Sequence, residues 1–301
     1  MIKQIDIMLP FGKINIFCNE ENFPDNWPVK SGNYNTFFSN NVYDVSFIRK
    51  NFLDDTYRNQ QIKQGHYLGH NMGMPASIRI EGKSIMVGIR EGFCDYHKIF
   101  WSYIIKYIFT VEALENNVLH IKAMALKDKR DRIHLFLGRM GSGKTSILHL
   151  FEQQGCKAIS NTHCFVKKNH IWGINSWRRV RDENNDSHYI FPSVANDLLE
   201  GEIFKTYIRC RELEDKIKGL SYSEQEAFIQ YFCSAITNYD LKEDIFEFQR
   251  KDKIRLFKVE NELIRQFAKR EISILPYDIK NREGRAKVES ILIKERGITC
   301  E

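Results

Sequence analysis

The sequence predicts an α/β protein built as two units, a smaller N-terminal α+β unit over residues 1–115 and an α/β unit over residues 116–301. Two observations predict this division. The stretch GRMGSGKTS (Gly138–Ser146) fits the pattern G-x-x-x-x-G-K-[ST] and lies between a predicted strand and a predicted helix. The first 115 residues instead alternate apolar and polar side chains and end in one amphipathic helix. A chain of 301 residues has room for one or two domains.

The N-terminal unit is predicted from short alternating segments. QIDIMLPFGKINIFC reads as strand material, and ASIRIEGKSIMVGIR (Ala76–Arg90) alternates on both sides of Glu81-Gly82, which predicts a hairpin. From Asp95 to Leu114, aromatic and apolar residues recur at i, i+3 and i+4, so we expect an amphipathic helix with its stripe in the core. The stretch Asn22–His70 has no clear period and is not assigned.

The second unit is predicted to begin with two strands. Asn116–Gly138 contains two apolar runs joined by the charged turn Lys127–Asp131. The second run leads into the glycine-rich stretch. Lys144–Gly155 then has apolar residues at helical spacing, and Gly155 is a natural stop just past the end of a helix.

The remaining elements follow in order along the chain. Cys156–Ser160 predicts the next strand, and Cys164–Ile174 predicts a hairpin. After Asp182 we expect the chain to be helical. Ser223 and Glu226 match a capping box at the start of one helix. The segment KVENELIRQFAKREISILPYDI predicts a helix that runs into a last strand.

The glycine-rich stretch predicts a phosphate site. Gly141 and Gly143 allow a tight turn that points several backbone N–H groups inward, and these donors together with a helix N-terminus favour an anion. Lys144 is expected to reach the β- and γ-phosphates, and the Thr145 hydroxyl to ligate Mg²⁺. We therefore expect a bound magnesium nucleotide, with ATP as the expected nucleotide. The residues predicted to hold it are Gly138, Arg139, Met140, Gly141, Ser142, Gly143, Lys144, Thr145 and Ser146.

Composition narrows the function classes. The net charge of +6 suits an anionic ligand as readily as nucleic acid, so it does not favour a nucleic-acid partner. No run of 18 apolar residues exists, so no membrane span is expected. The N-terminal residues alternate like a strand and make a poor signal peptide. The seven cysteines are scattered without a C-x-x-C pair, which favours a cytoplasmic chain with reduced thiols.

The order of elements around the glycine-rich stretch resembles a known family. LHIKAMAL before a charged turn, then IHLFLGRMGSGKTS, then QQGCKAIS and a hairpin, are similar to the HPr kinase-like branch of P-loop proteins. That branch is related in architecture to phosphoenolpyruvate carboxykinases. The resemblance covers Val118–Ile174 and extends to EISILPYDI. It implies a P-loop kinase domain of HPr kinase/PEP carboxykinase type with a smaller N-terminal α+β domain, and an ATP-dependent kinase whose acceptor is a hydroxyl of a small metabolite or of a Ser/Thr in a peptide or protein.

One departure from this family concerns the catalytic base. Members usually carry an Asp pair at the end of the strand after the P-loop helix, and one Asp acts as base and metal partner. This chain has Asn161, Thr162 and His163 there. Our hypothesis is that His163 accepts the proton of the acceptor hydroxyl and that Asn161 helps to hold Mg²⁺ or substrate. The alternative is that His163 caps a turn and the site is catalytically reduced. His120 is a weaker candidate, because a lone His on a strand is more often structural.

A charged segment follows the predicted hairpin. Arginines there can neutralise a transferring phosphoryl group. Neighbours on an extended segment alternate sides, so at most two of the three arginines can face the ligand. Arg178 and Arg181 are the two that we expect to act in catalysis. Arg179 is the third arginine of this segment. The carboxylate missing at Asn161 could come from the residues that follow, Asp182, Glu183 and Asp186. The alternative is a solvated run of charges.

Two other functions stay open at this stage. The chain could be a non-catalytic ATP-binding regulatory or accessory protein whose P-loop switches conformation, and loss of the Asp pair supports this. It could also be a nucleic-acid end kinase that uses Trp172, Trp177 and the neighbouring arginines, but a charge of +6 is thin support. The sequence specifies neither the acceptor nor the oligomeric state, and a homo-oligomer is compatible with it.

Overall fold

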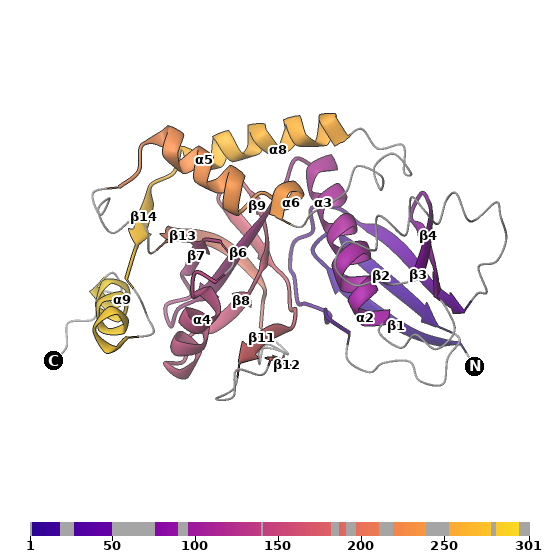
Figure 1. Ribbon diagram of the computed structural model, residues 1–301, viewed down its shortest axis with the longest axis horizontal. Coiled ribbons are helices and arrows are strands. Elements are labelled where there is room, and N and C mark those ends of the chain that lie inside the picture. Colours follow the sequence, from indigo (N-terminus) through magenta and orange to yellow (C-terminus); the bar gives the residue numbers. More distant parts are fainter. Residues whose placement is uncertain are drawn as a thin grey trace.

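Two large sheets lie side by side and are covered by helices (Figure 1). The computed structural model describes residues 2–18, 27–49, 76–89, 96–139, 141–181, 187–190, 197–210, 219–238, 253–277 and 281–294. Within these residues the chain forms a five-stranded sheet, a seven-stranded sheet and a two-stranded ribbon. The chain passes from the first sheet to the second between Glu115, the last residue of a helix, and Leu119, the first residue of a strand.

The first sheet has the described strand order β1-β2-β3-β5-β4. β1 and β2 form a hairpin, and β4 and β5 form the hairpin predicted around Glu81-Gly82, which is therefore confirmed. β3 runs parallel to both of its neighbours, β2 and β5. The strands are β1 (Lys3–Leu9), β2 (Gly12–Cys18), β3 (Asn41–Arg49), β4 (Ala76–Glu81) and β5 (Ser84–Ile89).

One helical segment leads from the first sheet to the second. It comprises α2 (Tyr96–Ile99), the π-helical turn η1 (Phe100–Ile105) and α3 (Lys106–Glu115). The predicted helix is confirmed, but its π-helical middle was not foreseen. Buried Glu112 of α3 accepts hydrogen bonds from Asn41 Nδ2 at 2.7 Å and from the Tyr43 hydroxyl at 2.6 Å. These bonds attach α3 to the first sheet.

The second sheet closes on itself at one end. Its described order is β10-β9-β6-β7-β13-β14, β8 pairs with β6, and β10 also pairs with β13. The pairing of β10 with β13 makes a small barrel of the central strands. β7 is parallel to β13, and β13 is parallel to β14. The strands are β6 (Leu119–Lys127), β7 (Ile133–Leu137), β8 (Lys157–Ser160), β9 (His163–Lys167), β10 (His170–Gly173), β13 (Glu200–Arg209) and β14 (Ile272–Leu275).

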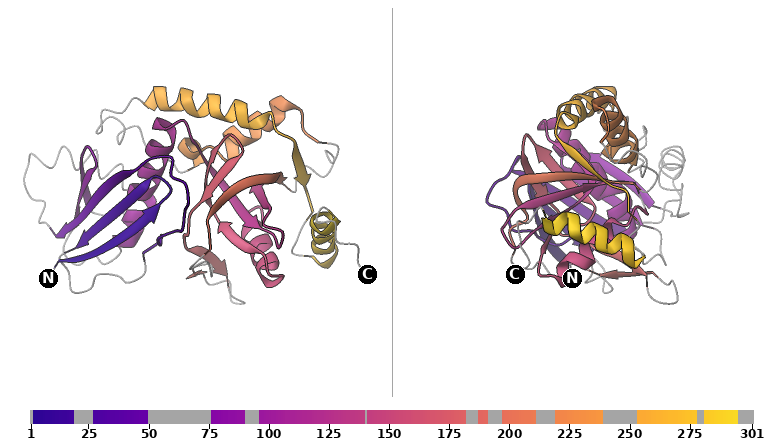
Figure 2. Two further views of the ribbon diagram at one scale, coloured as in Figure 1. Left: turned by 180° about the vertical axis from the view of Figure 1, so that it is seen from behind. Right: turned by 90° about the vertical axis from the view of Figure 1, so that its left-hand side faces the viewer.

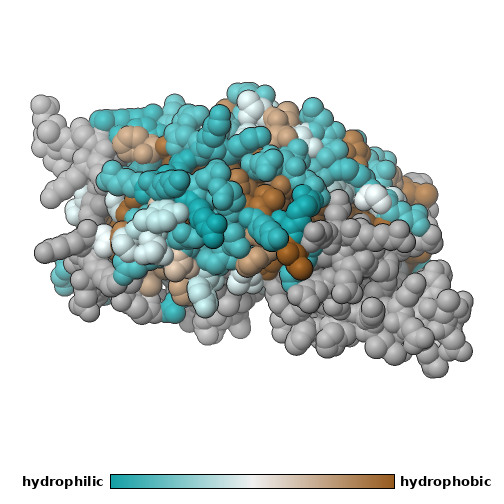
Figure 3. Space-filling view, turned by 90° about the horizontal axis from the view of Figure 1, so that it is seen from above, coloured by the Kyte–Doolittle hydropathy of each residue, from teal (hydrophilic) through white to brown (hydrophobic). Residues whose placement is uncertain are grey.

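Helices cover both faces of the second sheet. α5 and α8 lie on one face and α4 on the other, and α8 extends across the top toward α3 (Figures 1 and 2). Seen from above, the face that carries α5 and α8 is mostly hydrophilic (Figure 3). The helices are α4 (Lys144–Gln153), α5 (Tyr222–Phe232), α6 (Ala235–Asn238), α8 (Lys253–Ala268) and α9 (Arg282–Lys294), and the ribbon is β11 (Arg178–Arg181) with β12 (Ser187–Ile190).

One hydrophobic cluster runs through both predicted units, and a second cluster lies within the second unit. Phe11 of the first unit packs edge-to-face against Phe109 of α3 and Phe165 of β9. The Tyr34 hydroxyl donates to the Gly173 carbonyl at 2.9 Å. Because this cluster of buried residues runs through both sheets, the boundary near residue 115 separates two sheets and does not separate two cores.

Most predicted elements are confirmed, and one segment is wrong. The two strands before the glycine-rich stretch, the helix after it, the strand β8 and the hairpin β9–β10 all form where the pattern predicts them. The expectation of a helical chain after Asp182 is wrong, because Ser187–Ile190 and Glu200–Arg209 are strands. The pairing partners of β13 are β7, β10 and β14, which are distant in sequence, so local periodicity did not reveal it.

The capping box lies two residues earlier than predicted. Two overlapping S-x-x-E patterns occur here, and the helix α5 begins at the first of them. Ser221 is the N-cap residue, its backbone N–H donates to Glu224 Oε2 at 2.9 Å, and its hydroxyl accepts from the Glu224 N–H. The predicted Ser223–Glu226 box is therefore wrong, and Ser223 lies inside the first turn.

Replacing the two serines tests this register. Ser221→Ala is expected to lower the free energy of unfolding by about 1 kcal/mol, because it removes the acceptor for an unpaired helix N–H. Ser223→Ala is the matched control and is expected to change it by at most about 0.5 kcal/mol, as at other surface positions. Urea unfolding of both variants measures the difference. A larger loss at Ser223 than at Ser221 would contradict the observed cap.

Two further observations concern the described helices and cysteines. None of the described helices is both long and apolar enough to cross a bilayer. The five described cysteines form no disulfide and are all buried; Cys94 and Cys300 lie outside the described residues.

Candidate functional site

The glycine-rich loop joins the C-terminal end of β7, a central strand of the second sheet, to α4. Gly141 and Gly143 have φ angles of 81° and 84°, a left-handed conformation that strains any side chain with a Cβ. Gly138 is needed for another reason, since a Cβ there would lie 2.7 Å from the Arg209 carbonyl oxygen. Met140 lies outside the described residues. The glycines therefore fit the tight turn that the sequence predicts.

Lys144 folds its side chain into this loop. Its ammonium donates to the carbonyl oxygens of Gly138 at 2.5 Å and Arg139 at 2.9 Å, and lies 3.4 Å from the Ser142 hydroxyl. Burial lowers the pKa of Lys144 from 10.5 to about 8. The ammonium thus lies inside the turn at the N-terminus of α4, where the sequence predicts the β- and γ-phosphates.

The other predicted ligands of the nucleotide surround this lysine. Arg139 and Ser146 are exposed at the two ends of the loop, and Thr145 is half-buried in the first turn of α4. A hydroxyl at this position fits a Mg²⁺ ion that also binds phosphate oxygens and keeps its waters. Among the described residues, no group of three or more His, Cys, Asp or Glu side chains is placed to hold a metal.

Two residues from other parts of the chain, Lys122 and Cys233, lie beside the loop and were not predicted from the sequence. The Lys122 N–H of β6 donates to the Cys233 carbonyl at 2.8 Å, which brings the segment after α5 against the first half of β6. The Gly138 N–H hydrogen-bonds the Cys233 sulfur, and burial raises the pKa of this thiol to about 11, against the opposing effect of nearby Lys144. The sequence holds a signal for Lys122 as a site residue, because this charged residue interrupts the apolar run LHIKAMAL.

Asn161 is held by the fold at both ends of its amide. It is buried, its Oδ1 accepts from the Ser176 hydroxyl at 2.6 Å, and its Nδ2 donates to the Trp177 carbonyl at 2.8 Å. These bonds tie the turn between β8 and β9 to the segment before β11. The arrangement therefore favours a structural role for Asn161 and does not favour its predicted role as a ligand of Mg²⁺.

An Asn161→Asp substitution tests this structural role. A carboxylate has no N–H, so one of its oxygens would face the Trp177 carbonyl without a hydrogen bond. We expect the free energy of unfolding to fall by about 1–3 kcal/mol, the usual cost of an unsatisfied buried group. Chemical unfolding at neutral pH measures it.

The matched control is Asn281→Asp. Asn281 Oδ1 accepts from the Gly284 N–H at 2.6 Å just before α9, and Asp serves equally well at such a cap. Asn281→Asp is expected to leave the free energy of unfolding unchanged. If Asn161→Asp also leaves it unchanged, the hydrogen bonds of Asn161 do not stabilise the fold.

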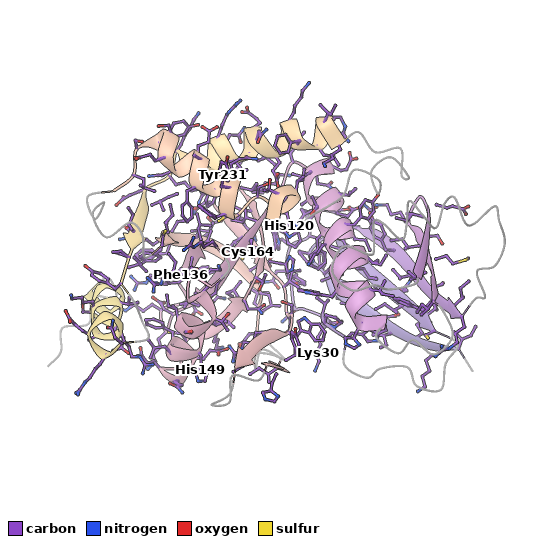
Figure 4. All side chains as sticks on the ribbon, in the orientation of Figure 1. Lys30, His120, Phe136, His149, Cys164 and Tyr231 are labelled. Carbon is purple, nitrogen blue, oxygen red and sulfur yellow. The ribbon has the colours of Figure 1, made fainter. Side chains whose placement is uncertain are left out.

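His163 lies inside the protein between the second sheet and the helix α3. Its Nδ1 is 3.0 Å from Nε2 of His120, and Nδ1 of His120 is 3.0 Å from the Thr110 hydroxyl. The rings of Trp101 and Phe109 pack edge-on against the imidazole of His163. Figure 4 shows His120 in the interior, between the central strands and α3.

Burial keeps this histidine pair neutral. It lowers the pKa of His163 well below 6.5, and the neighbouring His120 and Lys106 lower it further. Burial also lowers the pKa of His120 to about 3. A neutral imidazole enclosed by two aromatic rings does not face an acceptor hydroxyl, so this arrangement does not favour His163 as the general base.

Arg178 contacts the end of α4 that lies away from the loop. Its guanidinium forms an ion pair of 2.5 Å with Glu152. Glu152 is eight residues after Lys144, which corresponds to about 12 Å along the helix axis. The structure therefore does not bring Arg178 to the predicted phosphates. Arg181 ends β11, and its side chain lies outside the described residues, as do the side chain of Arg179 and the residues Asp182, Glu183 and Asp186.

A buried carboxylate lies on the other side of the Cys233 segment. Glu260 of α8 accepts from the Ser234 hydroxyl at 2.5 Å and from the Ala235 N–H at 2.8 Å, so it caps the short helix α6. Burial raises the pKa of Glu260 to about 7, although these hydrogen bonds oppose the shift. An acidic residue on the apolar stripe of α8, in line with Leu256 and Ile264, was a signal that could have found it.

Two comparisons with known proteins found no match. No protein-family model matches the chain, and no curated protein is significantly similar to it. The resemblance to the HPr kinase-like family stays a prediction, and the geometry around Lys144 carries the functional argument.

Proposed function

We propose that the chain binds ATP with Mg²⁺ at the glycine-rich loop and is an HPr kinase-like phosphotransferase. It would transfer the γ-phosphate to a hydroxyl of a small metabolite or of a Ser/Thr in a peptide or protein. One observation carries this proposal: the Lys144 ammonium lies within a turn formed by left-handed glycines at the start of α4. Inward N–H groups, a helix N-terminus and a lysine are the combination that binds a polyphosphate chain.

The roles of the loop residues follow from this proposal. The loop N–H groups would hold the phosphates, and Lys144 would leave the carbonyls of Gly138 and Arg139 to pair with the β- and γ-oxygens. Thr145 would help to hold Mg²⁺, which supplies neutralising charge to the phosphates when it is bound. The residue that accepts the proton of the acceptor is not among the side chains that surround Lys144 in the described structure.

A second function is favoured by Asn161 and His163. Asn161 replaces the family's Asp and is engaged by Ser176 and Trp177, while His163 is enclosed by aromatic rings. A nucleotide-binding loop with no base among the side chains that the structure describes around it suits a regulatory or accessory protein that binds ATP without transferring its phosphate. The nucleic-acid end kinase loses support, because Trp172 is buried and donates to Thr36 instead of facing a groove.

An acceptor screen with γ-labelled ATP separates these functions. Metabolites, peptides and oligonucleotides are each incubated with the wild-type protein and with Lys144→Ala. The kinase proposal predicts label transfer to one acceptor class by the wild type alone. Nucleotide binding without transfer to any acceptor would favour the regulatory function, and absence of binding would reject both.

We also propose a cytoplasmic location, supported by the five described cysteines, which form no disulfide with one another. Titration of denatured, unreduced protein is expected to find all seven cysteines of the chain as thiols, because a reducing compartment keeps them so. The control is the same protein after reduction, which should give an equal count. Fewer thiols before reduction than after it would contradict this location.

A further inference from the structure

Lys122 points to the same face of the second sheet as α4. Its neighbours Ile121 and Ala123 belong to the core under α5 and α8, whereas Met124 belongs to the core that contains Ile147 of α4. Side chains alternate along a strand, so Lys122 shares the side of Met124.

Lys122 also lies level with the glycine-rich loop. The next residue, Ala123, pairs with Leu137, the last residue of β7 before the loop. Lys122 and Lys144 are electrostatic neighbours: burial lowers the pKa of Lys144, and the charge of Lys122 lowers it further. The two ammonium groups therefore face a common space at the start of α4.

No described group neutralises the charge of Lys122. Its ammonium forms no ion pair or hydrogen bond with any residue that the structure describes, although burial lowers its pKa from 10.5. The donors of Lys144 go to neutral carbonyl and hydroxyl oxygens. Two neighbouring, partly desolvated cations with no carboxylate among the described residues beside them are unfavourable unless an anion joins them.

We propose that Lys122 is the second cation of the phosphate site and contacts the terminal phosphate of the bound nucleotide. This inference rests on the proposed function, because it uses the loop as the site of the α- and β-phosphates. The loop N–H groups enclose those two phosphates, and the lysine of such a loop reaches the β- and γ-oxygens. Lys122 lies on β6 beside Lys144 of α4, so it would share the terminal phosphate with Lys144. The ligand class is a nucleoside triphosphate.

The test compares ATP with ADP in the full-length chain. Calorimetry with Mg²⁺ present measures both affinities for the wild type, for Lys122→Met and for Lys127→Met. Lys127 is the matched control, since it ends the same strand about 17 Å away. Lys122→Met is expected to weaken ATP binding roughly 10- to 100-fold, the effect of losing one charged hydrogen bond, and to change ADP binding much less.

Two further measurements separate a ligand contact from a structural role. Without nucleotide, Lys122→Met should raise the temperature of unfolding, because it removes a partly buried charge that no described group compensates. Inorganic tripolyphosphate should stabilise the wild type more than this variant. Lys122→Gln, of nearly the same length, gives the same readouts if the methionine variant does not fold.

The outcomes distinguish this inference from the proposed function. If Lys122→Met keeps the wild-type preference for ATP over ADP, Lys122 does not contact the terminal phosphate, and the proposed function stands. If the wild type binds neither nucleotide, the proposed function fails and the inference fails with it.

Discussion

Lys144→Ala is expected to abolish phosphoryl transfer and to weaken binding of magnesium ATP. The substitution removes the ammonium that lies inside the glycine-rich loop. Loss of one preorganised donor to a transition state usually costs about 10²–10³-fold in rate, and loss of a charged hydrogen bond costs about 1.5–3 kcal/mol in binding. Calorimetry and γ-label transfer measure the two effects separately.

The control for this prediction is Lys157→Ala. Lys157 is exposed on β8 and pairs with Asp197 on the surface, so its loss should change neither binding nor transfer. Because burial lowers the pKa of Lys144 to about 8, ATP affinity of the wild type should also fall as the pH rises above that value. Wild-type affinity in Lys144→Ala would remove the phosphate site from the loop.

Glu260→Ala is expected to lower the free energy of unfolding by about 3 kcal/mol or more, since several buried donors would each lose an acceptor at about 1–3 kcal/mol. The carboxylate is fully buried and accepts from Ser234 and from the Ala235 and Ile236 N–H groups. Urea unfolding measures the loss. Glu262→Ala, an exposed site on the same helix, is the control and should stay within about 0.5 kcal/mol.

The pH dependence of stability gives a second test of Glu260. Burial raises the pKa of Glu260 from 4.5 to about 7, so the folded protein holds this proton over a range in which the unfolded chain has lost it. Its contribution is complete below pH 4.5 and is lost as the pH rises to about 7. Glu260→Gln cannot titrate. The stability of the wild type relative to this variant should therefore fall across that window, and a flat difference would contradict the burial of a protonated carboxyl group.

Elements with a local signal were predictable from the sequence. The hairpins β4–β5 and β9–β10 have alternating strands around short turns, and α4 has both a helical period and a terminal glycine. β13 has charged residues within a short apolar segment, and it exists because β7, β10 and β14 pair with it. The partners of β13 come from distant parts of the chain, so no local sequence pattern predicts this strand.

The residues of the candidate site also fall into those that local sequence predicts and those that tertiary packing positions. Lys144 and the glycines form one continuous stretch, and their arrangement follows from local backbone geometry. The positions of Lys122, Asn161 and His163 depend on how β6, β8 and β9 pack against α3 and the segment before β11. A polar turn such as Asn161–His163 looks the same in sequence whether it faces a ligand or is buried. In this protein the tertiary packing buries Asn161 and His163.

Hydrogen–deuterium exchange with and without magnesium ATP tests the central claim most directly. The claim is that the backbone N–H groups between Gly138 and Lys144 bind the phosphates of a nucleotide. ATP should slow exchange in the peptide that covers the loop and the first turn of α4, and this protection should be lost in Lys144→Ala. Saturating ATP that leaves exchange of this peptide unchanged in the wild type would contradict the claim.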